Sequence, residues 1–182
     1  MKYILLLYTF IFSQQVLFCQ QFYTDEGVTK FDGSKAAFEP IKASNNNTVS
    51  IIDSSDGQIA AVILISEFDF RLGLMQEHFN ENYLESNVYP KSTFVGQIKN
   101  FSLEELNQDF KEHEIEGVLT IKGINNDITT KAKIRKIDEK IELTSGFSVM
   151  LSDYKVKIPK IVFKKIDEEV KINLNFVYER KQ

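Results

Sequence analysis

The sequence contains almost no cysteine: Cys19 is the only one among 182 residues. An intrachain disulfide needs two thiols, so this chain has none. Cys19 also lies at the edge of an apolar N-terminal segment, so a chain that has lost this segment carries no thiol chemistry. The fold must be stabilised by its core alone, and the 163 residues that follow position 19 suffice for one domain of this kind.

Proline and clustered positive charge are also scarce. The chain has 3 prolines and no low-complexity linker, which favours a single domain. Its formal net charge is −4, whereas binding to phosphate backbones needs clustered Lys and Arg. The one basic row, from Lys131 to Lys136, alternates as the solvated face of a strand would, with an anionic surface partner as the alternative. We expect no nucleic-acid partner.

Motifs for catalysis and metal binding are absent from the sequence. There is no G-x-S-x-G elbow, no glycine-rich phosphate loop, and only two histidines, His78 and His113. His78 and Glu81 have H-x-x-E spacing, but Asn82 stands where the inverted zinc-protease pattern needs a second histidine. A zinc site needs three or four ligands at matched spacing. We therefore predict no enzyme activity, no metal and no cofactor, with a hydrolase based on His78 as a remote alternative.

The N-terminus reads as a targeting segment. Met1-Lys2 precedes an apolar run from Ile4 to Phe12, far shorter than the roughly 20 residues of a spanning helix. We predict that residues 1–19 are a cleaved secretory signal peptide and that residues 20–182 form the domain. The mature protein would be periplasmic or secreted, without a transmembrane segment. A lipid anchor at Cys19 is the alternative, because Leu17-Phe18-Cys19 resembles a lipobox.

After this segment, apolar and polar residues alternate with a period of two, which predicts antiparallel strands with one face in water. The clearest alternating rows are residues 93–99, 114–122, 128–135, 141–149 and 170–179. Residues 29–31 and 49–53 supply earlier strands. The segment Ile59 to Ile65 is apolar on both faces, so we expect a helix or a partner subunit to cover its outer side.

One short helix interrupts the strands. Leu72, Met75, Phe79 and Tyr83 are spaced as one face of a helix over residues 72–84. Tyr89-Pro90 ends any helix, because the residue before a proline is pushed out of the α region.

About eight strands, short turns and one helix predict an all-β fold, an up-and-down antiparallel barrel of eight strands. Closure removes exposed sheet edges. We expect turns at Asp56-Gly57, at Asn125-Asn126-Asp127 and at Asp138-Glu139-Lys140. A barrel of this size either fills its interior with side chains or holds one small ligand, and the sequence leaves both open. Gly96 and Gly117 either leave room inside or mark bends.

Two blocks of the sequence resemble a known family. His78-Phe79, Tyr83 to Ser86, Tyr89-Pro90 and Thr93-Phe94 resemble the signature of the YceI-like family. The stretch Glu116 to Ile124 is similar to that family's G-x-L-T-I-x-G-V strand and turn, with Lys122 where the family often has histidine. The resemblance extends over residues 27–179. It implies a lipocalin-like barrel that binds a lipid or polyisoprenoid.

An apolar binder needs no catalytic motif. Each buried methylene contributes about 0.8 kcal/mol, so a ten-carbon chain supplies roughly 8 kcal/mol gross. Our leading hypothesis is an exported, non-enzymatic protein that holds a long apolar ligand in its lumen. The alternative is a packed barrel that acts through its outer surface, as a partner-binding or homodimeric stress-related module. The candidate lining residues, with His78 and Tyr89 nearest the entrance, are His78, Phe79, Tyr83, Tyr89, Phe94, Phe147, Tyr154 and Phe176.

Overall fold

The computed structural model describes residues 21–35, 40–159 and 165–181, so the predicted signal peptide and Cys19 lie outside the described residues. The barrel strands are β1 (Gln21–Ser34), β2 (Lys42–Asp53), β3 (Gln58–Leu64), β5 (Lys91–Ile98), β6 (Lys111–Ile121), β7 (Ile124–Ile137), β8 (Lys140–Met150) and β9 (Ile166–Arg180). The shorter elements are η1 (Ile65–Glu67), β4 (Asp69–Phe70), α1 (Gly73–His78), the π-helical turn η2 (Phe79–Tyr83), η3 (Leu103–Glu105) and η4 (Leu151–Tyr154).

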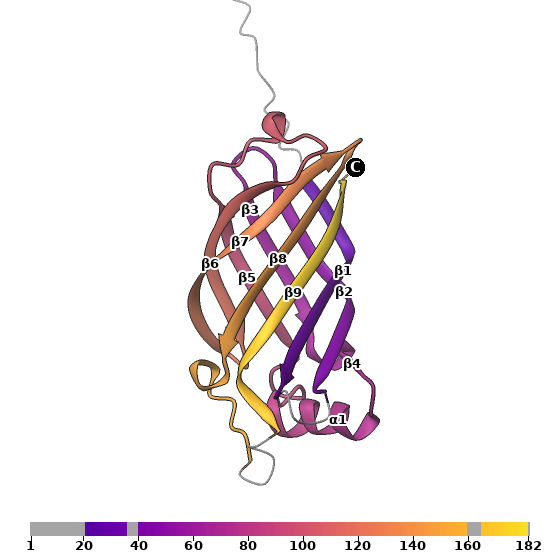
Figure 1. The fold of residues 1–182 in the computed structure, drawn as a ribbon, viewed down its shortest axis with the longest axis vertical. Coiled ribbons are helices and arrows are strands. Elements are labelled where there is room, and N and C mark those ends of the chain that lie inside the picture. The colour runs from indigo at the N-terminus through magenta and orange to yellow at the C-terminus, as the bar shows by residue number, and fades with distance from the viewer. Residues whose placement is uncertain (1–20, 36–39, 160–164, 182) are drawn as a thin grey trace, which may run out of the picture.

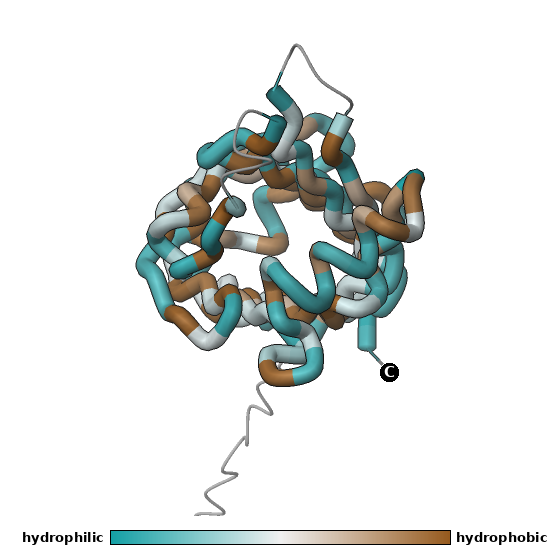
Figure 2. The backbone as a smooth tube through the Cα atoms, turned by 90° about the horizontal axis from the view of Figure 1, so that it is seen from below, coloured by the Kyte–Doolittle hydropathy of each residue, from teal (hydrophilic) through white to brown (hydrophobic). Residues whose placement is uncertain are grey.

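The strands close into a barrel (Figure 1). Each long strand pairs antiparallel with the next one along the chain, and β9 returns to pair with β1. The two-residue strand β4 extends the sheet at the start of β2. Seen from below, the backbone forms a continuous ring (Figure 2). The predicted eight-stranded up-and-down barrel is confirmed.

Two of the three predicted turns are in place, and one is wrong. Gly57, with a φ of 77°, follows Asp56 between β2 and β3, and Asp138-Glu139 joins β7 to β8. The β6–β7 turn is not at residues 125–127 but at Lys122-Gly123. Both residues have positive φ, 50° and 72°, as the tight turns that match strand twist require. Glycine adopts this conformation freely, so the chain reverses there and the polar residues that follow continue β7.

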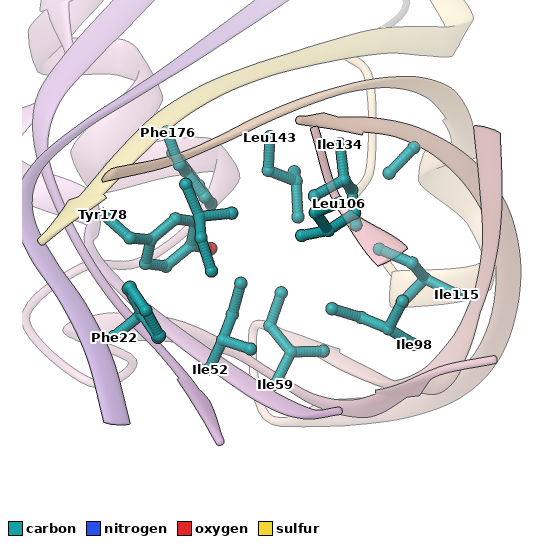
Figure 3. Close-up of a cluster of buried hydrophobic side chains, with 12 residues drawn as sticks. Phe22, Ile52, Ile59, Ile98, Leu106, Ile115, Ile134, Leu143, Phe176 and Tyr178 are labelled. Carbon is teal, nitrogen blue, oxygen red and sulfur yellow. The ribbon is translucent and has the colours of Figure 1, made fainter. Parts of the chain in front are cut away.

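The core consists of two clusters at opposite ends of the barrel. The upper cluster (Figure 3) contains Phe22, Ile52, Ile59, Ile98, Leu106, Ile115, Ala132, Ile134, Ile141, Leu143, Phe176 and Tyr178. The lower cluster, at the α1 end, contains Ala43, Ile65, Phe68, Phe70, Leu84, Val149, Tyr154, Val156 and Val170. The upper end therefore has the filled interior that a small barrel can have.

The α1 segment lies across the lower end of the barrel, below β4, and not on the outer wall (Figure 1). The expectation that this helix covers the outer side of β3 is therefore wrong: Val62 and Leu64 are 37% and 44% exposed. The apolar side chains of the helix, Met75 and Phe79, pack instead against the lower cluster. No helix within the described ranges is long and apolar enough to cross a bilayer.

Candidate ligand-binding cavity

A cavity of about 510 Å³ lies inside the barrel below the upper cluster. Most of its wall is buried or half-buried. Apart from Val62, the lining residues that are exposed to solvent are Leu72, Leu74, His78 and Lys165, which all belong to the α1 end. The cavity therefore opens at that end, the one that faces the viewer in Figure 2.

The other end of the cavity is closed. Ile59, Ile115, Leu143 and Phe176 belong both to the cavity wall and to the upper cluster. Behind them, Tyr178 and most other side chains of that cluster are completely buried (Figure 3). The lumen is therefore a blind pocket, with its floor in the middle of the barrel.

The wall of the cavity is almost entirely apolar. None of the described residues that line it is Asp or Glu, and its basic side chains are His78 and Lys165, both at the entrance. A charged group is costly to bury without a partner, so charge is confined to the mouth. Of the two tyrosines, Tyr83 is half-buried and Tyr154 is buried, and this burial raises the pKa of each hydroxyl.

Four hydroxyl groups of the wall have hydrogen-bond partners within the protein. The Thr29 and Thr48 hydroxyls are 2.8 Å apart. Ser145 donates to the carbonyl of Lys131 at 2.8 Å and lies 3.4 Å from the Thr130 hydroxyl. Since these groups find partners within the protein, they need no partner from a ligand. At these positions the lumen therefore presents mainly apolar surface to its contents.

Phe79 is the centre of the aromatic packing in the lower wall. The ring of Phe79 stacks on Phe31 at 5.3 Å and meets Phe68 at 5.5 Å and Phe70 at 4.9 Å. Such ring pairs add stability beyond their buried area. Leu84 donates its N–H to the carbonyl of Phe79 at 2.9 Å, a five-residue spacing. This wide turn brings both side chains onto the cavity wall.

The structure places seven of the eight predicted lining residues on the wall: His78, Phe79, Tyr83, Phe94, Phe147, Tyr154 and Phe176. Whether these side chains contact a ligand stays a prediction. Tyr89 is the exception. A Cβ added to Gly123 would lie 2.8 Å from its Cε1, so the Tyr89 ring lies over the β6–β7 turn, away from the cavity wall.

The two motif blocks meet in space. Glu85 pairs with Lys122 at 2.6 Å, and the Lys122 side chain is only 13% exposed. Tyr89 contacts Gly123 beside this pair. The motif residues therefore join the chain that follows η2 to the β6–β7 hairpin, which gives them a structural role at the open end.

Three phenylalanines of the wall, Phe31, Phe68 and Phe70, are not among the predicted lining residues. The alternation of Phe68 and Phe70 is a period-two signal that could have revealed two of them. Phe31 lies in a strand whose pairing shifts register at several points, and such shifts break the simple alternation.

Nothing in the described part of the chain provides a metal centre, since no three His, Cys, Asp or Glu side chains cluster there. His113 lies at the upper end, 3.4 Å from the carbonyl of Lys99 and beside the ring of Phe101. The two histidines therefore belong to opposite ends of the barrel.

The model of the YceI-like domain matches residues 20–178. The chain belongs to the YceI-like family. None of the curated proteins compared with it matches its sequence. Several solved structures share the fold of this YceI-like chain at low sequence identity.

A polyisoprenoid-binding domain from Saccharophagus degradans, implicated in plant cell wall breakdown, has a TM-score of 0.77 at 13% identity, over 88% of this chain and 98% of that one. BcnA of Burkholderia cenocepacia has a TM-score of 0.67 at 17% identity, over 82% and 95% of the two chains. The Campylobacter jejuni YceI protein gives 0.61 at 17% identity, over 80% and 87%. These likenesses establish the shared barrel.

Proposed function

We propose that this YceI-like barrel is a non-enzymatic binding protein that holds one long apolar chain, a polyisoprenoid or another lipid, in its lumen. The observation that carries the proposal is the blind apolar cavity of about 510 Å³. Ligand pockets commonly have volumes of about 300–1,000 Å³ and apolar walls with few polar groups. The similarity to a polyisoprenoid-binding domain supports the same ligand class.

The geometry orients such a ligand. The pocket is closed by Phe176 and its neighbours and open at α1, so the chain enters tail first. Burial of about ten methylenes supplies roughly 8 kcal/mol gross, enough for binding without any special contact. The polar head of the ligand stays at the mouth, where His78 and Lys165 are the charged or titratable groups among the described residues that line the cavity and are exposed to solvent.

Thermal unfolding tests the proposal. Delipidated full-length chain is titrated with a polyprenol or a long-chain fatty acid. A ligand at 100 times its Kd stabilises the folded state by about 2.7 kcal/mol, which raises Tm by roughly 5–10 °C for a domain of this size. If no chain length moves Tm and the protein purified under gentle conditions carries no lipid, the proposal fails.

We also propose that the protein is exported to the periplasm or secreted after residues 1–19 are cleaved. The short apolar run behind a positive N-terminus supports this. The intact mass of the protein from the periplasmic fraction tests it: loss of residues 1–19 is expected, an added diacylglyceryl group would mean anchoring at Cys19, and full-length cytoplasmic protein would contradict export.

A homodimer is the second candidate, and one surface feature favours it. Ile51, Ala60, Val95 and Val118 are paired in register across four neighbouring strands and form an outer apolar row. Val95 is 63% exposed. Exposed apolar patches often mark interfaces. Light scattering tests this candidate. A wild-type dimer that becomes a monomer in Val95→Glu supports it, and a wild type that is monomeric at all concentrations excludes it.

A further inference from the structure

Leu72 and Leu74 belong to two surfaces at once. Both side chains line the cavity, yet they are 41% and 62% exposed to solvent. Single exposed leucines are ordinary on protein surfaces. These two are unusual because the same side chains continue the apolar wall of the lumen out into water. We refer to Leu72, Gly73 and Leu74 as the entrance rim.

All three residues of the rim are exposed to solvent. A Cβ added to Gly73, between the two leucines, would meet no atom within 4 Å. On the side where a side chain would stand, Gly73 therefore faces open space among the described residues, in contrast to Phe79 six residues later, which three other phenyl rings surround.

This arrangement bears on how a lipid enters. An apolar chain that crosses water between a membrane and the lumen loses its burial on the way, which slows such transfer by orders of magnitude. A continuous apolar path from the membrane into the lumen would keep the chain out of water and so avoid this slow step. Resting on the function proposed above, we infer that the entrance rim docks on a lipid bilayer, with Leu72 and Leu74 inserted among the acyl chains while the lipid passes.

The charges beside the rim suit a bilayer surface. Arg71 and Lys165 are exposed, and so are Asp69 and Glu77. Long basic side chains can extend to the headgroups while their stems stay in apolar surroundings. Because acidic and basic groups are mixed there, we attribute docking to insertion of the leucines rather than to attraction by anionic lipid. The outer apolar row is not continuous with the cavity wall in this way, since Val95 does not line the cavity.

Stopped-flow transfer of a fluorescent polyprenol from phosphatidylcholine vesicles to the full-length chain tests the inference. The variant Leu72→Ser/Leu74→Ser should slow transfer by about tenfold or more, because two apolar anchors are lost. Because both leucines also line the cavity, its equilibrium uptake of the same polyprenol from detergent should fall somewhat, but by much less than the transfer rate, since the deeper wall of the lumen is unchanged. Val177→Ser, a control on β9 with the same 41% exposure as Leu72, should leave the rate within about twofold, and Leu74→Ile should preserve it.

The outcomes separate the two claims. Normal transfer by the double serine variant, uptake from detergent that falls as much as transfer does, a wild-type rate that does not rise with vesicle concentration, or slow transfer by Val177→Ser would each overturn docking through the rim. Absence of uptake even from detergent would overturn the proposed function together with it. Thermal unfolding of each variant checks that the barrel is intact.

Discussion

Gly123 shows how one residue without a side chain fixes a contact of the YceI-like signature. Its φ is 72°, and an added Cβ would lie 2.8 Å from the ring of Tyr89. Gly123→Ala should lower the free energy of unfolding by about 1–3 kcal/mol, through the left-handed backbone and the clash together. Gly73→Ala, which meets open space, should leave stability unchanged or slightly raised. Urea unfolding measures both, and equal effects would contradict the role of the turn.

Tyr178 makes stability depend on alkaline pH. Its hydroxyl is fully buried, which raises its pKa well above the ordinary value, although the hydrogen bond with Ser50 at 2.9 Å lowers it in part. Above pH about 10, the unfolded tyrosine releases a proton that the folded one keeps. This contribution to stability is therefore complete below pH 10 and is lost as pH rises, at up to about 1.4 kcal/mol per pH unit.

The variant Tyr178→Phe checks this linkage. At pH 7 it should cost about 1 kcal/mol, since Ser50 loses one hydrogen bond but still donates to the carbonyl of Ala60. Above pH 10, its stability should fall less steeply than that of the wild type, in urea titrations at a series of pH values. If the free energies of unfolding of the two proteins fall with the same slope above pH about 10, Tyr178 does not cause the loss. Tyr23→Phe is the control.

At the scale of elements, Phe79 anchors the lid segment formed by α1 and η2. Phe79→Ala removes three ring contacts and should cost roughly 2–3 kcal/mol, less than a fully buried phenylalanine because Phe79 is half-buried. The lid should loosen, so bound lipid should dissociate faster. Phe110→Ala, at an exposed ring beneath Arg135, should lose about 1 kcal/mol and leave lipid dissociation unchanged. Dissociation that responds to both variants alike would contradict an anchoring role for Phe79.

Strands could be predicted wherever the alternation of apolar and polar residues is sufficient to define them. The rows in β5 to β9 gave strands and inward faces because one side of each is apolar and the other polar. The β6–β7 turn was misplaced because Asn125-Asn126-Asp127 has turn composition, whereas the positive φ values at Lys122-Gly123 fix the real turn. The helix was expected over residues 72–84, but its second half is a π turn shaped by the packing of Phe79. Tertiary contacts of this kind leave no local signal.

At the scale of the whole molecule, closure followed from the number of strands, but the contents of the interior did not. Gly96 and Gly117 illustrate why. Phe94 lies over both glycines, so an added Cβ at either would come within 2.5 and 2.7 Å of its ring. These glycines thus accommodate a side chain rather than leave open space. Whether a barrel is filled depends on how all inward side chains share the volume, and sequence spacing does not contain that information.

Two neighbouring alanines of β3 allow the lumen itself to be tested. Ala61 lines the cavity, whereas Ala60 is paired with Ile51 and Val95 in the outer apolar row. Ala61→Phe places a ring inside the lumen, and Ala60→Phe places the same ring outside. Any general effect of a bulky residue in this strand is therefore common to both variants.

Native mass spectrometry of the two variants and the wild type, each purified under gentle conditions, measures bound lipid directly. The wild type and Ala60→Phe should carry one lipid per chain, and Ala61→Phe should lose most of it while it stays folded. Lipid retained equally by both variants, or absent from all three proteins, would contradict a ligand held in the lumen.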